Sequence, residues 1–364
     1  MEISAHTARI ATVVVLLSCA MEAQVAESEK ARELLNSGHA AEAAALYREL
    51  ASADPRNAGL LLNLSIAEYR AGMFAEAAAS AAGALALNPE LVPARLFLGA
   101  SYLEMGVLTK AVDALERVVS SDPGERNARL MLGEALLRSN RPQAAMEHLQ
   151  LVSGMLPANP RVWYALGRTY ESLGQQDAAS EAWKRLMALP PSVQLYTHLA
   201  ERNEAERRWV EAARDWREAL KLQPDDTAVR VKLAWALFRK RDYAEAMSAL
   251  KPLLSVPDNA EVPFLYGASW LNLQQPEKAI PFLRDALLRD TGSLPAHAAL
   301  GQALIQTGKP EEAIPLLERA LPGDRDGSVH FQLFRAYQLT GQSAKAQQAL
   351  AAYRRFRASL SGEP

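Results

Sequence analysis

Residues 163–191, WYALGRTYESLGQQDAASEAWKRLMALPP, contain the pattern that decides the fold of this chain. Apolar and small residues recur every three or four positions up to Tyr170, and again from Ala179, which is the spacing of a helix with one apolar face. Gly174 separates the two runs, and Pro191 follows the second. The stretch therefore predicts a first helix, a tight turn and a second helix that ends before the proline.

The same pattern recurs along the chain in steps of 33 or 34 residues. One column of ten alanines marks the period: Ala43, Ala77, Ala111, Ala145, Ala179, Ala212, Ala246, Ala279, Ala313 and Ala346. A helix glycine twelve residues earlier is found at Gly99, Gly133, Gly167, Gly267 and Gly301, and a turn glycine five residues earlier at Gly38, Gly72, Gly106, Gly174, Gly308 and Gly341. Several columns in phase indicate a repeat protein, in which each hairpin buries its apolar face against its neighbours.

This pattern resembles the tetratricopeptide repeat family. The clearest repeat reads Trp163-x2-Leu166-Gly167-x2-Tyr170, Ala179-x3-Trp183 and Pro191, with Trp183 where the family usually has Phe. The resemblance implies an all-α fold, an α-solenoid of about ten helix-turn-helix repeats whose first helices line the concave groove of a superhelix. We expect one continuous array over residues 24–360 and a short tail over 361–364.

Two repeats depart from the family pattern. In repeat six, Arg207 or Arg208 stands in place of the turn glycine, and Ala200 replaces the helix glycine. In repeat seven, Pro252 lies inside the expected second helix, and proline removes a helical hydrogen bond. We expect that helix to bend or end early.

Residues 1–23 are predicted to be a signal segment outside the fold. Residues 10–20, IATVVVLLSCA, carry no charge but are too short to span a bilayer, as is typical of a secretory signal peptide. Leu16 to Cys19 also resembles a bacterial lipoprotein box, although Leu17 is bulky for its position. We expect cleavage after Ala20 and a periplasmic or secreted protein. The alternatives are an outer-membrane lipoprotein lipidated at Cys19 and an uncleaved cytoplasmic start.

Composition excludes several classes of site. A balance of 40 basic against 42 acidic residues argues against a dedicated nucleic-acid binder, and one cysteine excludes a cysteine-based metal centre within the chain. The six histidines show no metal-binding spacing. No catalytic residues, cofactor or metal are predicted, and membrane contact is expected only through a lipid anchor.

A second stripe on the first helices, outside the repeat core, is the candidate binding surface. Its apolar and aromatic members are predicted to face the groove, with packing between adjacent first helices as the alternative. The predicted groove residues are Leu62, Ile66, Tyr69, Leu96, Leu103, Leu130, Tyr164, Arg168, Trp235, Phe238, Phe264 and Leu271.

These patterns favour a non-enzymatic scaffold of the bacterial cell envelope that binds a partner peptide or helix in the groove. One alternative is a lipoprotein subunit of an outer-membrane assembly or secretion complex. Another is an enzyme with a site in repeats five and six, which would require perturbed ionisation of Arg168, His198, Glu201 or Glu204 in a closed cleft. The partner's identity and the oligomeric state do not follow from the sequence.

Overall fold

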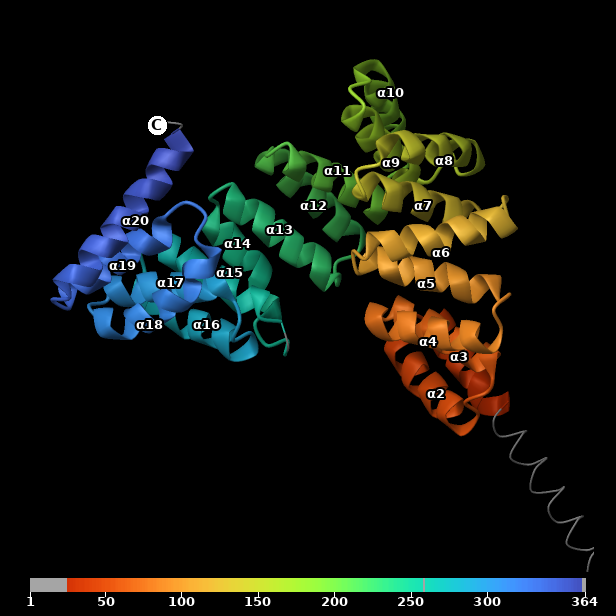
Figure 1. Cartoon of the computed structure of the whole chain (residues 1–364), viewed down its shortest axis with the longest axis horizontal. Helices are drawn as coiled ribbons and strands as arrows, with labels where there is room; N and C mark the ends of the chain where they lie inside the picture. The colour runs from red at the N-terminus through yellow and green to blue at the C-terminus, as the bar shows by residue number, and fades with distance from the viewer. Residues whose placement is uncertain (1–24, 258, 362–364) are drawn as a thin grey trace, which may run out of the picture. The chain divides into compact units, whose positions relative to one another are not determined.

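The structure is a computed structural model that describes residues 25–257 and 259–361 (Figure 1). The predicted signal segment, with Cys19, lies outside the described residues. The chain divides into two compact units, Met1–Leu189 and Pro190–Pro364. Every regular element in the described residues is a helix, so the prediction of an all-α fold is confirmed.

The N-terminal unit is a series of helical hairpins. Residues 25–36 are helical, and the helices that follow are α2 (Ala40–Ala53), α3 (Ala58–Arg70), α4 (Phe74–Leu87), α5 (Val92–Glu104), α6 (Leu108–Ser121), α7 (Arg126–Arg138), α8 (Pro142–Met155), α9 (Pro160–Ser172) and α10 (Gln176–Met187). Odd-numbered helices from α3 onward are the first helices of the repeats, and even-numbered helices are the second.

The C-terminal unit continues the alternation, with two short 3-10 turns, η1 and η2. Its elements are α11 (Val193–Ala205), α12 (Trp209–Leu222), α13 (Thr227–Arg239), α14 (Tyr243–Leu250), η1 (Lys251–Leu253), α15 (Glu261–Asn272), α16 (Pro276–Arg289), α17 (Leu294–Gln306), α18 (Pro310–Ala320), η2 (Leu321–Gly323), α19 (Ser328–Leu339) and α20 (Ser343–Ser361).

Helices begin and end where their sequence chemistry predicts. Asn57 caps α3 by accepting a hydrogen bond from the Gly59 amide at 3.1 Å, which satisfies a donor that the helix leaves free. Prolines occupy the first position of three second helices, where a missing N–H costs nothing. These are Pro142 of α8, Pro276 of α16 and Pro310 of α18.

The turn between the two helices of a repeat requires a left-handed residue. Gly72 has φ of +77°, a conformation that glycine adopts without steric cost. In repeat six the left-handed residue is Arg207, with φ of +57°. Of the two arginines predicted for the turn position, Arg207 therefore occupies it. An L-residue there is strained by about 1–2 kcal/mol.

In each repeat with a helix glycine, the two helices approach each other closely at that glycine. A Cβ added to Gly133 of α7 would lie 2.6 Å from Leu149 Cγ of α8, and one added to Gly167 would lie 2.6 Å from the Trp183 ring. Such separations are far below ordinary carbon contacts of about 3.5–4.0 Å. The small residue therefore sets the spacing of the hairpin.

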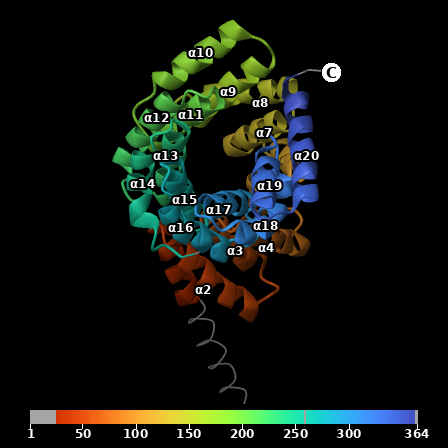
Figure 2. The same cartoon turned by 90° about the vertical axis from the view of Figure 1, so that its left-hand side faces the viewer.

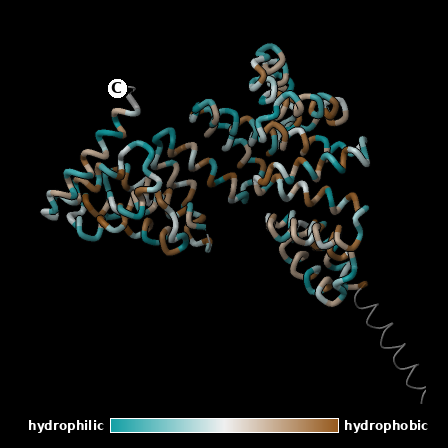
Figure 3. Tube along the Cα trace, viewed as in Figure 1, coloured by the Kyte–Doolittle hydropathy of each residue, from teal (hydrophilic) through white to brown (hydrophobic). Residues whose placement is uncertain are grey.

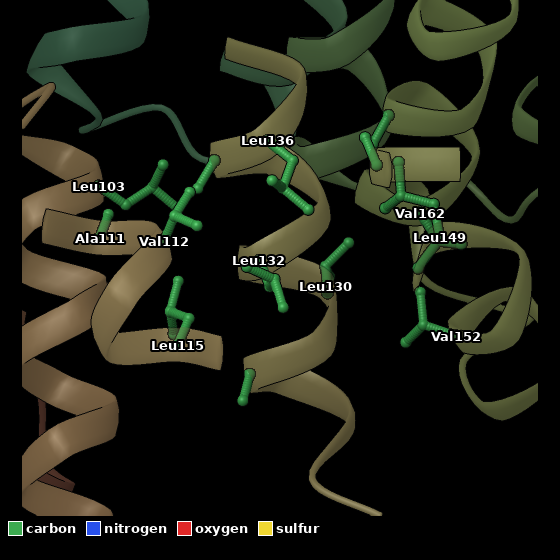
Figure 4. Packing of buried hydrophobic residues seen from close by; sticks show 14 of the residues in the cluster. Leu103, Ala111, Val112, Leu115, Leu130, Leu132, Leu136, Leu149, Val152 and Val162 are labelled. Atoms are coloured by element: carbon green, nitrogen blue, oxygen red, sulfur yellow. The ribbon is translucent and has the colours of Figure 1, made fainter. Parts of the chain in front are cut away.

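Each core cluster extends across more than one repeat, and the largest one runs from Leu103 to Ala182 in the N-terminal unit. Figure 4 shows Leu130, Leu132 and Leu136 of α7 between Leu115 of α6 and Leu149 of α8. Hydrophobic and hydrophilic residues both occur along the helices, as the hydropathy colours of Figure 3 show. Each repeat thus buries its apolar face against the next, as expected of a solenoid.

First helices form the more tightly packed layer of each unit. Neighbouring first helices, such as α5 with α7 and α15 with α17, contact each other more closely than neighbouring second helices do. In the C-terminal unit, α13, α15, α17 and α19 follow one another in this way (Figure 2). Each unit therefore curves with its first helices on the inner side.

Repeat seven departs from this regularity, as Pro252 predicts. Its second helix, α14, ends at Leu250 after eight residues, and η1 follows. Arg289 of α16 holds the next segment by donating hydrogen bonds to three backbone carbonyl oxygens: Leu254 at 3.2 Å, Val256 at 2.7 Å and Asn259 at 3.2 Å. A side chain of repeat eight therefore stabilises the irregular end of repeat seven.

Candidate protein-binding surface

The predicted groove residues of α3, α5 and α7 divide into half-buried and core positions. Leu62, Ile66, Tyr69 and Leu96 are all half-buried. Leu103 and Leu130 are each only 2% exposed and belong to the core of Figure 4. For these two leucines the alternative interpretation applies, because they pack between adjacent helices and present no surface to a partner.

A polar cluster crosses the inner side of the N-terminal unit. Arg161 of α9 binds Glu134 of α7 through two hydrogen bonds, of 3.1 Å from Nε and 2.6 Å from Nη2. Burial raises the pKa of the Tyr69 hydroxyl, and the charge of Glu104 raises it further. First helices of successive repeats therefore share one electrostatic environment. Sequence reasoning missed Arg161, because its counterpart 34 residues earlier, Asn127, is uncharged and the period offers no signal for it.

Tyr164 and Arg168 lie in a packed region of repeat five. Arg168 Nη1 donates a hydrogen bond to the Tyr164 hydroxyl at 3.3 Å. The Tyr164 ring meets the Trp183 ring edge-on, with centroids 5.9 Å apart. Trp183 in turn donates from Nε1 to Glu171 at 2.8 Å. This group joins α9 to α10.

The acidic residues of repeat six make the same kind of bond. Glu204 of α11 accepts a hydrogen bond from Trp216 Nε1 of α12 at 2.8 Å, which repeats the geometry of Glu171 and Trp183. Burial raises the pKa of the Glu204 carboxyl, which the bond from Trp216 opposes. The nearby His198 and Glu201 are 3.1 Å apart. Since an equivalent carboxylate–indole bond recurs one repeat away, Glu204 joins the two helices of repeat six as Glu171 joins those of repeat five.

Three aromatic rings meet on the inner side of the C-terminal unit. Trp235 and Phe238 of α13 have ring centroids 5.9 Å apart, and Trp235 lies 6.2 Å from Phe264 of α15. All three side chains are partly exposed, whereas Leu271, further along α15, is 5% exposed and belongs to the core. The aromatic part of the predicted stripe therefore stays available at the surface, and Leu271 does not.

These rings line a cavity of about 460 Å³, here called the aromatic hollow. The C-terminal half of α13 contributes one wall, and the starts of α15 and α17 contribute the other. The lining consists of Trp235, Phe238, Arg239, Ala260, Glu261, Phe264, Asp290, Ser293 and Pro295. A concave site with an apolar floor and a few polar groups has the general character of a binding site.

Charged residues that the sequence analysis missed surround the aromatic hollow. The Arg239 guanidinium lies 5.8 Å from the Trp235 ring centroid, and the Trp235 indole N–H donates a hydrogen bond to Glu261. Asp290 accepts a hydrogen bond from the Gly292 amide at 2.9 Å. Glu261 is the first residue of α15, and Asp290 precedes α17. A search for stripes along the first helices does not include these positions.

The described residues contain no set of three His, Cys, Asp or Glu side chains placed to hold a metal ion. In the same residues, no helix has both the length and the apolarity needed to cross a bilayer.

Comparison with known proteins identifies the repeats. One tetratricopeptide repeat family model matches residues 160–326, and a second matches residues 28–91 and 98–160. The comparison with curated proteins found no match.

Several solved structures are similar to this chain over different shares of its length. A chain of the APC/C hetero-tetramer Cut9–Hcn1 is 20% identical, with a TM-score of 0.52; the match covers 80% of this chain and 58% of that one. TTC0263, a thermophilic TPR protein of Thermus thermophilus, is 24% identical over 50% of this chain and 100% of its own, with a TM-score of 0.45. MamA AMB-1 is 26% identical over 46% and 98%, with a TM-score of 0.41.

The Cut9–Hcn1 likeness shows a shared solenoid fold. The family matches reach into both units and follow the period seen in the helices. The chain belongs to the tetratricopeptide repeat family.

Proposed function

We propose that this protein is a non-enzymatic scaffold of the bacterial cell envelope, which holds a peptide or helix of a partner protein against its first helices. Tetratricopeptide repeat proteins typically bind other proteins or peptides, which makes a scaffold the natural starting point. The aromatic hollow carries the proposal, because Trp235, Phe238 and Phe264 are partly exposed around a cavity of binding-site size.

We also propose that residues 24–360 form one continuous array of repeats. The alanine column continues without a break from Ala179 to Ala212, across the boundary between the two units. One of the family matches, over residues 160–326, also crosses this boundary. These observations support a single repeat series.

The envelope location rests on residues 10–20, whose uncharged run is typical of an export signal. We propose cleavage after Ala20, which would leave a mature chain without cysteine. Lipidation at Cys19 would instead make the protein a lipoprotein, as in the alternative of an outer-membrane assembly subunit.

Crosslinking in envelope extracts tests the binding surface. The purified chain should capture a discrete partner, and the variant Trp235→Ala/Phe238→Ala/Phe264→Ala should lose it. A matched control, Leu151→Ala/Leu222→Ala/Leu288→Ala, removes three exposed apolar side chains from second helices and should retain the partner. Equal capture by all three proteins would refute the proposed surface.

A further inference from the structure

Resting on the proposed function, we infer that the aromatic hollow receives a lysine or arginine side chain of the partner, carried by a segment with an apolar residue beside it. The hollow combines aromatic faces with two carboxylates, those of Glu261 and Asp290. The faces of aromatic rings carry negative charge density and attract cations. Trp235 and Phe264 provide such faces in a partly exposed setting.

Cationic side chains lie over aromatic rings at several other places in this chain. The ammonium of Lys278 lies 4.6 Å from the Trp270 ring centroid, and that of Lys110 lies 5.3 Å from the Tyr102 centroid. In the hollow itself, Arg239 lies over Trp235. The Glu261 carboxylate also accepts the Trp235 indole N–H, which fixes the ring and increases its electron density.

The charge of the lining favours a cation over an anion. In the described part of the chain, Glu261 and Asp290 accept hydrogen bonds from Trp235 and Gly292 but form no ion pair, and Arg239 is the only basic residue that lines the hollow there. A partner carboxylate placed here would face two like charges. A purely apolar partner would cover both carboxylates without a counter-charge, which is unfavourable. A basic side chain pairs with them while its methylene groups lie against the rings.

Selection from a random peptide library displayed on phage, against the full chain, tests this inference. We expect the selected peptides to carry Lys or Arg next to an apolar residue. In fluorescence anisotropy, the variant Glu261→Gln/Asp290→Asn should weaken the best peptide roughly tenfold, the order expected for two partly exposed ion pairs. In Glu261→Gln, the amide oxygen of the new side chain can still accept the Trp235 indole N–H, so the ring stays in place.

Two further variants test whether the effect depends on the two carboxylates of the hollow. The control Glu277→Gln/Glu311→Gln removes two acidic charges from second helices of the same unit, outside the hollow, and should leave binding unchanged. Arg239→Ala should leave binding equal or tighter, because it removes a like charge.

Acidic consensus peptides, an unchanged affinity in Glu261→Gln/Asp290→Asn, or a large loss in Arg239→Ala would each overturn the inference. If binding still required Trp235 and Phe264, the proposed function would stand without it. A library that yields no peptide dependent on these two rings would overturn both.

Discussion

The close approach of helices at Gly133 predicts that an added methyl group destabilises the array. In Gly133→Ala, the new Cβ would lie 2.6 and 2.7 Å from two carbon atoms of Leu149, a side chain with no exposed surface. Because ordinary carbon contacts need about 3.5–4.0 Å, α7 and α8 must separate by roughly 1 Å or Leu149 must leave its rotamer. Either change disturbs a core shared with both neighbouring repeats.

A matched glycine isolates the size of this effect. Gly83 in α4 also lies inside a helix, but its added Cβ would be 3.5 Å from Leu61 Cδ1, an ordinary contact. Replacing glycine by alanine within a helix gains about 1 kcal/mol from helix propensity alone. That gain is common to both variants and cancels in their difference. The overpacking of Gly133→Ala should therefore place it about 1–3 kcal/mol below Gly83→Ala in unfolding free energy.

Urea unfolding followed by far-ultraviolet circular dichroism measures the difference. The curves should be fitted with a nearest-neighbour model, because repeats unfold in local units. Leu149→Ala in the Gly133→Ala background should cost less than in the wild type, because the added methyl group occupies space that Leu149 vacates. Equal shifts in Gly133→Ala and Gly83→Ala, or additive effects of Gly133→Ala and Leu149→Ala, would refute the reasoning.

Three other predictions concern single residues. The Tyr337 hydroxyl donates to Glu318 at 2.7 Å, so Tyr337→Phe should lose about 1 kcal/mol of stability at neutral pH. Burial and Glu318 raise the pKa of Tyr337 from 10.0 to about 12, so the folded chain holds this proton more tightly than the unfolded chain does. The difference in unfolding free energy between the wild type and Tyr337→Phe should therefore be complete below pH 10 and disappear as pH rises towards 12. A difference in chemical denaturation that stays constant with pH would contradict this. Arg207→Gly relieves a left-handed residue and should raise the unfolding free energy in urea by a few tenths to about 1 kcal/mol, whereas a decrease would show that Arg207 is unstrained. Intact mass of the exported protein should give an N-terminus at Met21 or slightly later, and a lipid-modified Cys19 would show that the lipoprotein alternative is right.

The repeat architecture could be predicted because its signals are local and periodic. Gly133 and the helix-ending Pro252 each act through backbone geometry within one repeat, so the sequence alone locates them. One hydrogen bond that recurs with the repeat period was not predicted, although the residues that form it recur in the sequence. Arg129 and Trp163, 34 residues apart, each donate to the carbonyl oxygen of the proline six residues earlier, at 2.6 and 2.7 Å.

The binding surface was less predictable, because exposure depends on contacts between repeats. Leu103 and Phe238 occupy equivalent stripe positions, yet Leu103 is enclosed by the core, whereas Phe238 packs against Tyr243 at 5.3 Å and remains partly exposed. The acidic residues of the aromatic hollow come from the segments that precede or begin α15 and α17. Their position beside Trp235 follows from the stacking of three repeats, which no single period encodes.

The early end of α14 has a mechanical consequence. A helix of eight residues rises only about 12 Å, against about 21 Å for one of fourteen. The irregular segment after it is held by the buried Leu253 and by hydrogen bonds from the side chain of Arg289. Under tension along the chain, repeat seven should therefore lengthen before the regular repeats on either side. That same segment leads directly into Ala260 and Glu261 of the aromatic hollow. If the aromatic hollow binds a partner as proposed, tension along the chain would disrupt that site before the regular repeats lengthen, so that mechanical load would release the partner.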